Sequence, residues 1–294
     1  MFVEAIEQAA AYTRPTHSII RYYGSNTVHP AAATLFFVNS DGWALTCAHV
    51  ARQLSSANQL HDKFSAFKNE RDNILGKKKE KKLLKDLERK YAFNNNSMIE
   101  IKNRFMHCVD GPLNLEVFIH QDVDLALLKF NDFTHLLCTS FPVFVRDHTN
   151  LKQGKYLCRM GFPFPEFSNF EFDANSDSIQ WTTTGRTETP RFPIEGMVTR
   201  KLLGAGGSIL GFELSTPGLR GQSGGPAFDT EGRVWGMQAA TAHLDLNFDV
   251  DIEVIRDGNK RRVRESAFLH VGHCVHTGVI KEFLREKSVQ FHEA

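Results

Sequence analysis

The chain has 294 residues, of which 41% are hydrophobic and 23% charged, as is typical of a globular protein large enough for two cores. Its 35 basic and 34 acidic residues leave a formal net charge of +1, so no overall field favours nucleic acid or a membrane surface. No stretch approaches the roughly 20 apolar residues that cross a bilayer.

The N-terminal segment, MFVEAIEQAAAYTRPTH, contains Glu4 and Glu7 and no basic residue before Arg14. A secretory signal has a basic head and then an apolar run, so this segment does not resemble one. The five cysteines are odd in number and widely scattered, namely Cys47, Cys108, Cys138, Cys158 and Cys274. They are interpreted as reduced thiols, and we expect a cytoplasmic protein.

Short apolar runs typical of β-strands follow the N-terminal segment in two groups. The first group lies at 18–24, 33–39, 43–50, 114–120, 124–130 and 141–147, and the second at 154–162, 196–203, 209–215, 233–240 and 268–275. NSDG at 39–42 predicts a hairpin turn. Two groups of about six strands predict an all-β fold of two antiparallel six-stranded barrels, over 1–150 and 151–294.

One helical insertion, 56–92, interrupts the first group. Apolar residues recur at helical spacing on both sides of Gly76, which predicts two helices forming a hairpin. Residues 68–90 carry ten basic and five acidic side chains. A solvated hairpin with one apolar face packed on the barrel and a docking site for a regulatory or substrate protein both remain open. Nucleic-acid binding is disfavoured, because the acidic residues are interleaved with the basic ones and no aromatic platform accompanies them.

The segment RGQSGGPAF, residues 220–228, surrounds Ser223 with three glycines and a proline. Small residues at this density indicate that backbone must approach something closely. A glycine-rich turn is one interpretation, and a nucleophilic serine with free neighbouring N–H groups is the other. A serine hydroxyl becomes a good nucleophile only when a base removes its proton and a third group orients that base.

Two side chains at strand ends meet these requirements. His49 follows the apolar strand in LTCAHV, and Asp124 immediately precedes the apolar strand in DLALLKF. A carboxylate held close to the interior needs a partner, because burying it alone is costly. The order His49, Asp124, Ser223 is the one found in two-barrel serine proteases.

The segments TCAHV, DLALL and GQSGGP resemble the three signature segments of the chymotrypsin/trypsin-like serine proteases. ATLFFVNSDGWALTCAHV, GQSGGPAFDTEGRVWGMQAAT and FLHVGHCVHTGVIKEFLRE resemble the bacterial Deg/Htr branch more closely. This resemblance covers roughly 17–55 and 98–287, implies a C-terminal helix and leaves the insertion outside. We expect no PDZ-like region after this helix.

The resemblance implies a serine endopeptidase that cleaves proteins or peptides through an acyl-enzyme. Ser223 is the expected nucleophile, His49 the base and Asp124 its orienting group, and the N–H groups of Gly221 and Ser223 form the expected oxyanion hole. Gln222 stands where zymogen-activated enzymes carry an aspartate, so we do not expect activation by N-terminal cleavage. The alternatives are a catalytically silent binding module on the same fold and an enzyme held latent until a partner engages 56–92.

The expected substrate site follows from the same resemblance. Pro217 is expected at the pocket base, Ala239, Ala240 and Thr241 along the edge that pairs with substrate, and the strand near His270 as the far wall. Because Pro217 is not acidic, an apolar residue is expected before the cut. The charged segment 243–265 is either a self-satisfied hairpin or an overhang that attracts basic substrates.

The cluster HVGHCVH at 270–276 raises the question of a metal site. On a strand, its ligand-type side chains are too far apart to converge on one ion, so strand packing is the expected role. The sequence predicts no metal and no cofactor.

Overall fold

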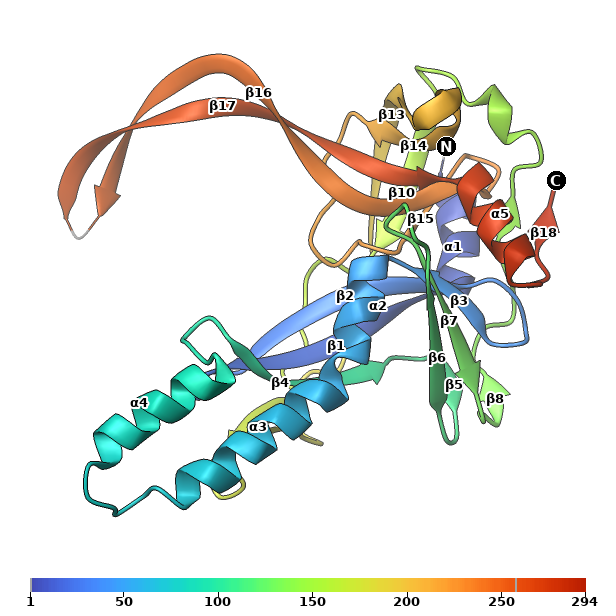
Figure 1. Cartoon of the computed structure of the whole chain (residues 1–294). Coiled ribbons are helices and arrows are strands. Elements are labelled where there is room, and N and C mark those ends of the chain that lie inside the picture. The colour runs from blue at the N-terminus through green and yellow to red at the C-terminus, as the bar shows by residue number, and fades with distance from the viewer. Residues whose placement is uncertain (1, 257) are drawn as a thin grey trace.

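The computed structural model describes residues 2–256 and 258–294, and the fold is mostly β with few helices (Figure 1). The helices are α1 (Val3–Tyr12), α2 (Ala48–Ser55), α3 (Ala57–Asp72), α4 (Glu80–Tyr91) and α5 (Thr277–Glu286), with 3-10 turns at His148–Asn150 and Ala205–Gly207. Helix α1 was not expected from the sequence. Its buried side chains, Ala5, Ala9 and Tyr12, recur at helical spacing and pack into the main core.

The first sheet has six strands in the order β4-β1-β2-β3-β7-β6. Their bounds are β1 Thr13–Tyr22, β2 His29–Phe37, β3 Trp43–Thr46, β4 Met98–Phe105, β6 Asn114–Ile119 and β7 Ala126–Asn131. The predicted turn at 39–42 joins β2 to β3, with Gly42 at a φ of +83° and Phe36 paired with Leu45. Beside this sheet, β5 (Val109–Asp110) pairs with β8 (His135–Leu136).

The second sheet has the order β15-β10-β13-β14-β17-β16-β9-β18. Its strands are β9 Val143–Phe144, β10 Tyr156–Gly161, β13 Phe192–Leu203, β14 Ile209–Leu214, β15 Pro226–Phe228, β16 Arg233–Arg256, β17 Asn259–His276 and β18 His292–Glu293. Because β15 also pairs with β16, six of these strands form a ring. A small separate ribbon pairs β11 (Phe170–Asp173) with β12 (Ser178–Trp181).

Two complete barrels are not what these pairings show. Over the part of the chain that the structure describes, β4 and β6 end the order of the first sheet and do not pair with each other, so that sheet stays open. The expected fold therefore holds in a coarser form, a mostly β architecture with a half-barrel first sheet. The division near residue 150 stays a prediction, and β9, just before it, already joins the second sheet.

The main core lies where the two sheets meet. Phe36, Leu45 and Leu127 of the first sheet share one buried cluster with Phe228 and Met237 of the second. Helix α5 packs Ile280, Phe283 and Leu284 into the same cluster. Since apolar side chains from both sheets are removed from water together, the relative position of the sheets is fixed by burial.

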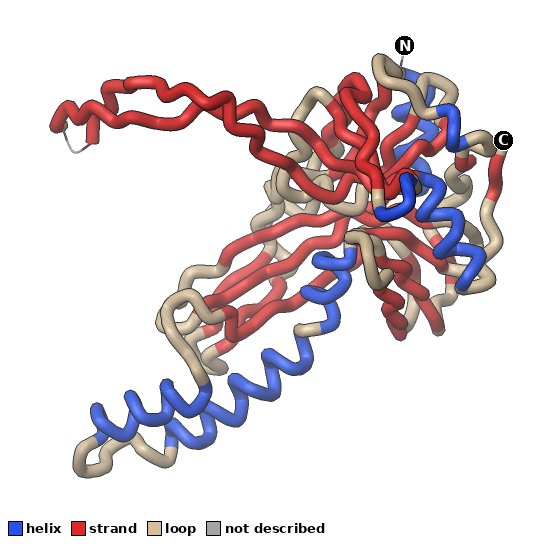
Figure 2. Tube along the Cα trace, turned by 45° about the horizontal axis from the view of Figure 1, so that its top comes forward, coloured by secondary structure: helices blue, strands red, loops and turns tan. Residues whose placement is uncertain are grey.

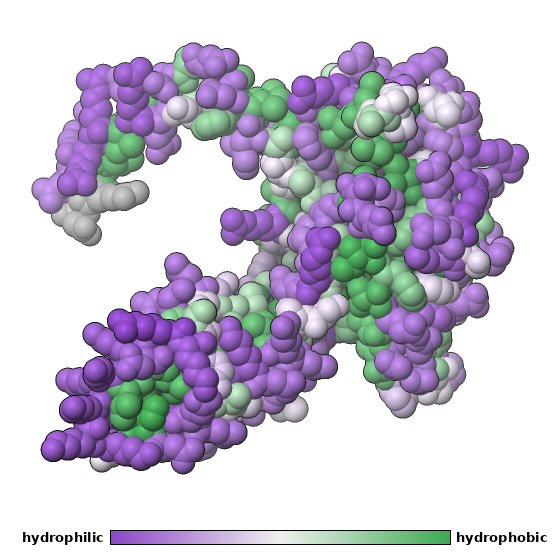
Figure 3. All heavy atoms as spheres, viewed as in Figure 1, coloured by the Kyte–Doolittle hydropathy of each residue, from purple (hydrophilic) through white to green (hydrophobic). Residues whose placement is uncertain are grey.

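Two long elements leave this body on the same side (Figures 1 and 2). One is the helical hairpin of α3 and α4, which has its own small core of Phe64, Phe67, Leu87, Phe93 and Ile99. The other is the arm, defined here as the parts of β16 and β17 beyond the pair Asp245 and Phe268. A wide hollow separates the arm from the helical hairpin (Figure 3).

Candidate active site

His49 lies in the first turn of α2, directly after strand β3 and its buried successor Cys47. The strand ends at Thr46, and the chain enters the helix through Cys47, whose extended backbone places His49 at the surface with half of its side chain exposed. A helix beginning at the end of a buried strand therefore holds the imidazole at the edge of the first sheet.

Asp124 lies just before β7 and accepts two hydrogen bonds from His49. Its Oδ2 lies 2.7 Å from Nδ1 of the His49 ring, and its Oδ1 accepts the His49 backbone N–H at 2.9 Å. Burial alone raises the pKa of Asp124, but the hydrogen bonds from the His49 ring and backbone outweigh it, and the net pKa is lowered. The carboxylate therefore stays ionised and favours the neutral tautomer of His49 that carries its proton on Nδ1.

The glycines around Ser223 are explained by close backbone contacts. Gly221 has a φ of +96°, and a Cβ there would lie 2.5 Å from the Phe162 carbonyl oxygen. Gly224 has a φ of +90°, and its Cβ would lie 2.1 Å from the Thr34 carbonyl oxygen. Both positions require a residue without a side chain, because the backbone conformation and the space exclude a Cβ.

The N–H groups of Gly221 and Ser223 have no acceptor among the hydrogen bonds of the described chain. By contrast, the N–H of Gln222 donates to the Leu219 carbonyl, and that of Gly224 to the Gln238 carbonyl. The Gln222 side chain also bonds within this region, to the Leu219 N–H and the Phe192 carbonyl. The loop that carries Ser223 thus has two N–H donors, two residues apart, without an acceptor among the described residues.

Ser223 and His49 line one cavity of about 180 Å³, together with Gly221 and residues of β1, β2 and α2. In this geometry the Ser223 hydroxyl lies 3.4 Å from the Ala239 carbonyl oxygen and donates to it. The structure therefore brings His49, Asp124 and Ser223 to one place from three distant parts of the chain. It shows the link between His49 and Asp124 as a short hydrogen bond.

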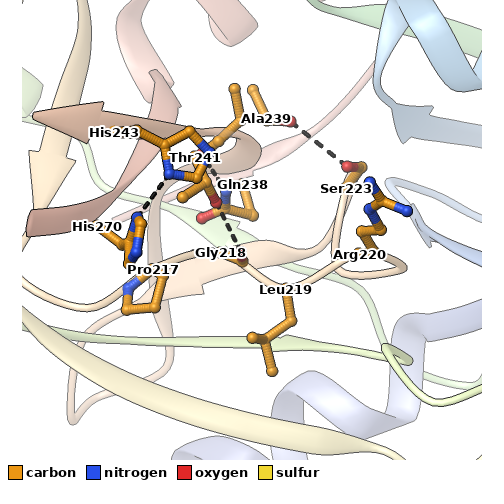
Figure 4. A pocket seen from close by; sticks show the side chains of 11 residues that line it. Pro217, Gly218, Leu219, Arg220, Ser223, Gln238, Ala239, Thr241, His243 and His270 are labelled. Atoms are coloured by element: carbon orange, nitrogen blue, oxygen red, sulfur yellow. Dashed lines mark hydrogen bonds between the residues drawn. The ribbon is translucent and has the colours of Figure 1, made fainter. Parts of the chain in front are cut away.

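A second cavity, of about 390 Å³, also reaches Ser223 (Figure 4). It contains every residue expected at the substrate site, namely Pro217, Ala239, Ala240, Thr241 and His270. Its other lining residues are Gly218, Leu219, Arg220, Gln238 and His243. Both cavities share Ser223 and Arg220, so Ser223 lies at their junction.

The model of the trypsin-like peptidase domain family matches residues 33–237. This is more than half of the chain, and it includes His49, Asp124 and Ser223. The chain belongs to this trypsin-like peptidase family. No curated protein matches this trypsin-like peptidase.

Two solved structures similar to this trypsin-like peptidase are of an HtrA-type protease. AlgW with a tripeptide is 12% identical, with a TM-score of 0.49, and the match covers 97% of this chain and 62% of that one. A variant of AlgW with a tripeptide is 11% identical, with a TM-score of 0.47 and the same coverage. The trypsin-like peptidase described here thus spans about 62% of the length of these chains.

The charged segment 243–265 forms most of the arm of this trypsin-like peptidase. Asp249 pairs with Arg264 at 2.6 Å and Asp251 with Arg262 at 2.8 Å across the two strands. At the base of the arm, His243 and His270 are a cross-strand pair that lines the larger cavity. The charges of this segment are thus paired with one another along the arm, as the first alternative expects, and the attraction of basic substrates stays a prediction.

Three residues important to this arrangement were not singled out from the sequence. Thr34 accepts the Phe162 N–H and donates to the Gly221 carbonyl, which fastens the serine loop to β2. Cys47 donates from Sγ to the Gln238 carbonyl at 3.2 Å. Arg159 is fully buried behind the larger cavity. Each acts through contacts with residues far away in the chain, for which the sequence offers no local signal.

Among the described residues, one group of three metal-ligating side chains converges to within 4.8 Å, namely Cys47, His49 and Asp124. Burial, and then the nearby Asp124, raise the pKa of the Cys47 thiol well above its usual range, so it remains protonated. In the HVGHCVH segment, His276 caps α5 by accepting the Gly278 N–H. None of the helices described is long and apolar enough to cross a bilayer.

Proposed function

We propose that the protein is a serine endopeptidase that cleaves protein or peptide substrates through an acyl-enzyme on Ser223. The observation that carries this proposal is the pair of hydrogen bonds from His49 to Asp124, in a cavity shared with Ser223. They place the proton of the neutral ring on Nδ1 and leave Nε2 free to accept one from Ser223.

The reaction begins when the Ser223 hydroxyl rotates from the Ala239 carbonyl toward Nε2 of His49. Nε2 accepts the hydroxyl proton as Oγ attacks the scissile carbonyl, and His49 then gives that proton to the leaving amine. Water attacks the acyl-enzyme in the same way and releases the new carboxyl end. Asp124 keeps its negative charge throughout and stabilises the imidazolium.

The free N–H groups of Gly221 and Ser223 are the proposed oxyanion hole. They face the carbonyl oxygen that becomes negative during attack, and such a donor is typically worth about 3–4 kcal/mol of transition-state stabilisation. The substrate backbone pairs with the edge Ala239 to Thr241. Among the described residues, β15 is the strand that pairs on that side of β16, and its pairing ends at Met237, before this edge begins.

A binding module without catalysis is the second candidate, since the Ser223 hydroxyl bonds to Ala239 rather than to His49. The test compares cleavage and binding of an unfolded, fluorescently labelled protein by the wild type, Ser223→Ala and His49→Ala. The peptidase cleaves it, and both variants bind without cleaving. Binding without cleavage by all three proteins identifies the module instead.

Control by a partner at 56–92 is the third element of this proposal. Helix α2 carries His49 and continues through Ser56 into α3. A partner that moves the helical hairpin would therefore also move the helix that carries His49. The loop and first turn of α4 carry five lysines, at 77–79, 81 and 82, which are attractive to an acidic partner. A protein that binds this hairpin is expected to change the rate of active-site labelling.

A further inference from the structure

The larger cavity beside Ser223 has three basic lining residues, Arg220, His243 and His270, and no acidic one. Arg220 lies at the end close to Ser223, and His243 and His270 lie at the opposite end (Figure 4). If Ser223 is the nucleophile and Ala239 to Thr241 the substrate edge, this cavity receives the side chain before the cut. Its chemistry then decides which substrates are cleaved.

Arg159 adds a positive charge behind the wall of this cavity. Its Nη1 donates to Gln238 Oε1 at 2.6 Å, and its Nη2 to the carbonyls of Thr216 and Pro217 at 3.0 and 3.2 Å. Nη2 also donates to the Thr216 hydroxyl at 2.5 Å. Gln238 and Pro217 line the cavity, so the guanidinium is one residue removed from its interior.

This buried charge has no counter-ion within residues 2–256 and 258–294. Arg159 is 0% exposed, its acceptors are all neutral, and its Nε is buried without a hydrogen-bond partner. Arg159 forms no ion pair with any of the described residues. The buried Arg21, by contrast, pairs with Glu100 at 2.5 Å. A buried charge normally has a partner of opposite sign, because desolvation is costly.

The fold is built to admit this guanidinium. A Cβ at Gly272 would lie 2.0 Å from Nη1 of Arg159, so glycine at this position of β17 makes room for it. Burial lowers the pKa of Arg159, but an arginine keeps its charge in proteins. The buried guanidinium of Arg159 therefore places a fixed positive charge behind the wall of this cavity.

The histidine pair supplies a hydrogen-bond donor at the far end. The Nδ1 atoms of His243 and His270 lie 2.5 Å apart, so one ring donates to the other. In a neutral pair, the accepting ring carries its own proton on Nε2. That N–H has no acceptor among the side chains described, whichever of the two rings accepts.

We propose that this cavity selects substrates with an acidic side chain, glutamate or aspartate, immediately before the cut. The field of Arg159 and Arg220 favours the carboxylate, and the histidine pair donates to it. The same groups repel a lysine or arginine side chain, and the cavity lining has no carboxylate to pair with it. This specificity rests on the proposed peptidase function, and it differs from the apolar preference expected from Pro217 alone.

The test measures kcat/KM for peptides that differ only at the residue before the cut, with Glu, Gln, Asp, Leu or Lys there. Gln matches Glu in shape without its charge. We expect Glu or Asp to exceed Gln and Leu at least tenfold, and Lys to be the poorest. A preference for Leu or Lys, or equal rates for Glu, Asp and Gln, overturns the proposal.

Two sets of variants assign the effect to the named groups. Arg159→Met is expected to lower the Glu-to-Gln ratio several-fold, and so is His243→Leu combined with His270→Leu. His243 and His270 are exposed at the base of the arm, so their replacement is not expected to disturb folding. The histidine variant therefore keeps the proposal testable if Arg159→Met does not fold. Arg186→Met, a surface arginine paired with Glu166, is the matched control and leaves the ratio unchanged.

Labelling by a fluorophosphonate separates this proposal from the peptidase function. The probe reacts with an activated serine, and it has no amino-acid side chain that must fit the larger cavity. A labelled protein that prefers Leu or Lys retains the peptidase function and loses the acidic specificity. A wild type that neither labels nor cleaves any of the five peptides overturns both.

Discussion

The orientation of His49 depends on both oxygens of one carboxylate. Asp124 accepts the ring Nδ1–H with one oxygen and the backbone N–H of the same residue with the other, so side chain and helix start are held together. An amide at position 124 has the same shape but one donor end. It therefore either loses one of these bonds or holds the ring in the wrong tautomer.

Asp124→Asn is accordingly expected to lower the rate of fluorophosphonate labelling by about three to four orders of magnitude, with the protein still folded. The matched control is Asp122→Asn, which changes an exposed carboxylate two residues away and is expected to keep the wild-type rate. Equal rates for Asp124→Asn and the wild type contradict the role of Asp124.

Two buried histidines make stability depend on pH. Burial lowers the pKa of His17 and of His276 to about 4, whereas an unfolded histidine titrates near 6.5. Above pH 6.5 both states hold neutral rings. As the pH falls from about 6.5 toward 4, the unfolded chain binds these protons first, and the free energy of unfolding decreases by up to about 3 kcal/mol per histidine.

Urea unfolding between pH 7.5 and 5 measures this effect. His17→Gln is expected to lose stability less steeply with falling pH than the wild type. Its unfolded chain has one such histidine left to protonate, instead of two. His61→Gln, on the surface of α3, serves as the control with the wild-type slope. Identical slopes for His17→Gln and the wild type contradict the assignment.

At the scale of single residues, the sequence predicted groups within recognisable local segments. TCAHV, DLALL and GQSGGP each carry one member of the proposed triad, and the structure places these segments together. Arg159 and Thr34 were missed, because their roles come from contacts 79 and 187 residues away in the chain. The residues around Arg159 or Thr34 in the sequence do not indicate such distant contacts.

At the scale of elements, the serine loop depends on a seam with strand β2. Thr34 connects the two through its hydroxyl, which donates to Gly221 O at 2.7 Å, and through its N–H, which donates to Ser223 O at 3.1 Å. Thr46 of β3 donates to the Thr34 carbonyl at 2.8 Å. Strand β2, and β3 that leads to His49, thus position the loop that carries Ser223.

Thr34→Val keeps the shape of this seam and removes its hydroxyl. The Phe162 N–H and the Gly221 carbonyl each lose their bond to it, and we expect a loss of about 1–3 kcal/mol in the free energy of unfolding, together with slower labelling of Ser223. Urea denaturation and labelling measure the two effects. Thr27→Val, an exposed matched control, leaves both unchanged; a wild-type labelling rate for Thr34→Val contradicts the role of the seam.

The strands were predicted better than their closure. Alternating and apolar runs located most strands of both sheets, and the stripes on both sides of Gly76 located α3 and α4. The ring of the second sheet depends on β15, a strand of three residues that pairs with two neighbours. So short a strand has too little pattern to predict its pairing, and whether a sheet closes was not predictable from strand count.

At the scale of the whole molecule, the proposed site lies at the bases of the arm and the helical hairpin. His243 and His270 at the base of the arm line the larger cavity, and Gln53 and Leu54 of α2, which leads into the helical hairpin, line the smaller one. The arm also continues the strand whose edge, Ala239 to Thr241, is the proposed substrate edge. A long polypeptide therefore has more of this strand to pair with than a short peptide does.

Shortening the arm tests this difference. Replacing residues 246–267 with an Asn-Gly turn keeps His243, His270 and the register of Asp245 with Phe268. We expect hydrolysis of short peptides to stay within about twofold, and cleavage of an unfolded protein to fall about tenfold. An exchange of Asp249 and Arg264 keeps the arm and the charge pair as a control, and equal losses for peptides and proteins contradict this role of the arm.

The central claim is that His49 and Asp124 activate the hydroxyl of Ser223. Intact mass spectrometry after treatment with a fluorophosphonate, followed by peptide mapping of the adduct, tests it most directly. The account predicts one adduct per wild-type chain, located on Ser223, no adduct in Ser223→Ala, and a strongly reduced rate in His49→Ala. An adduct on another residue, or the same rate of modification without the imidazole of His49, contradicts it.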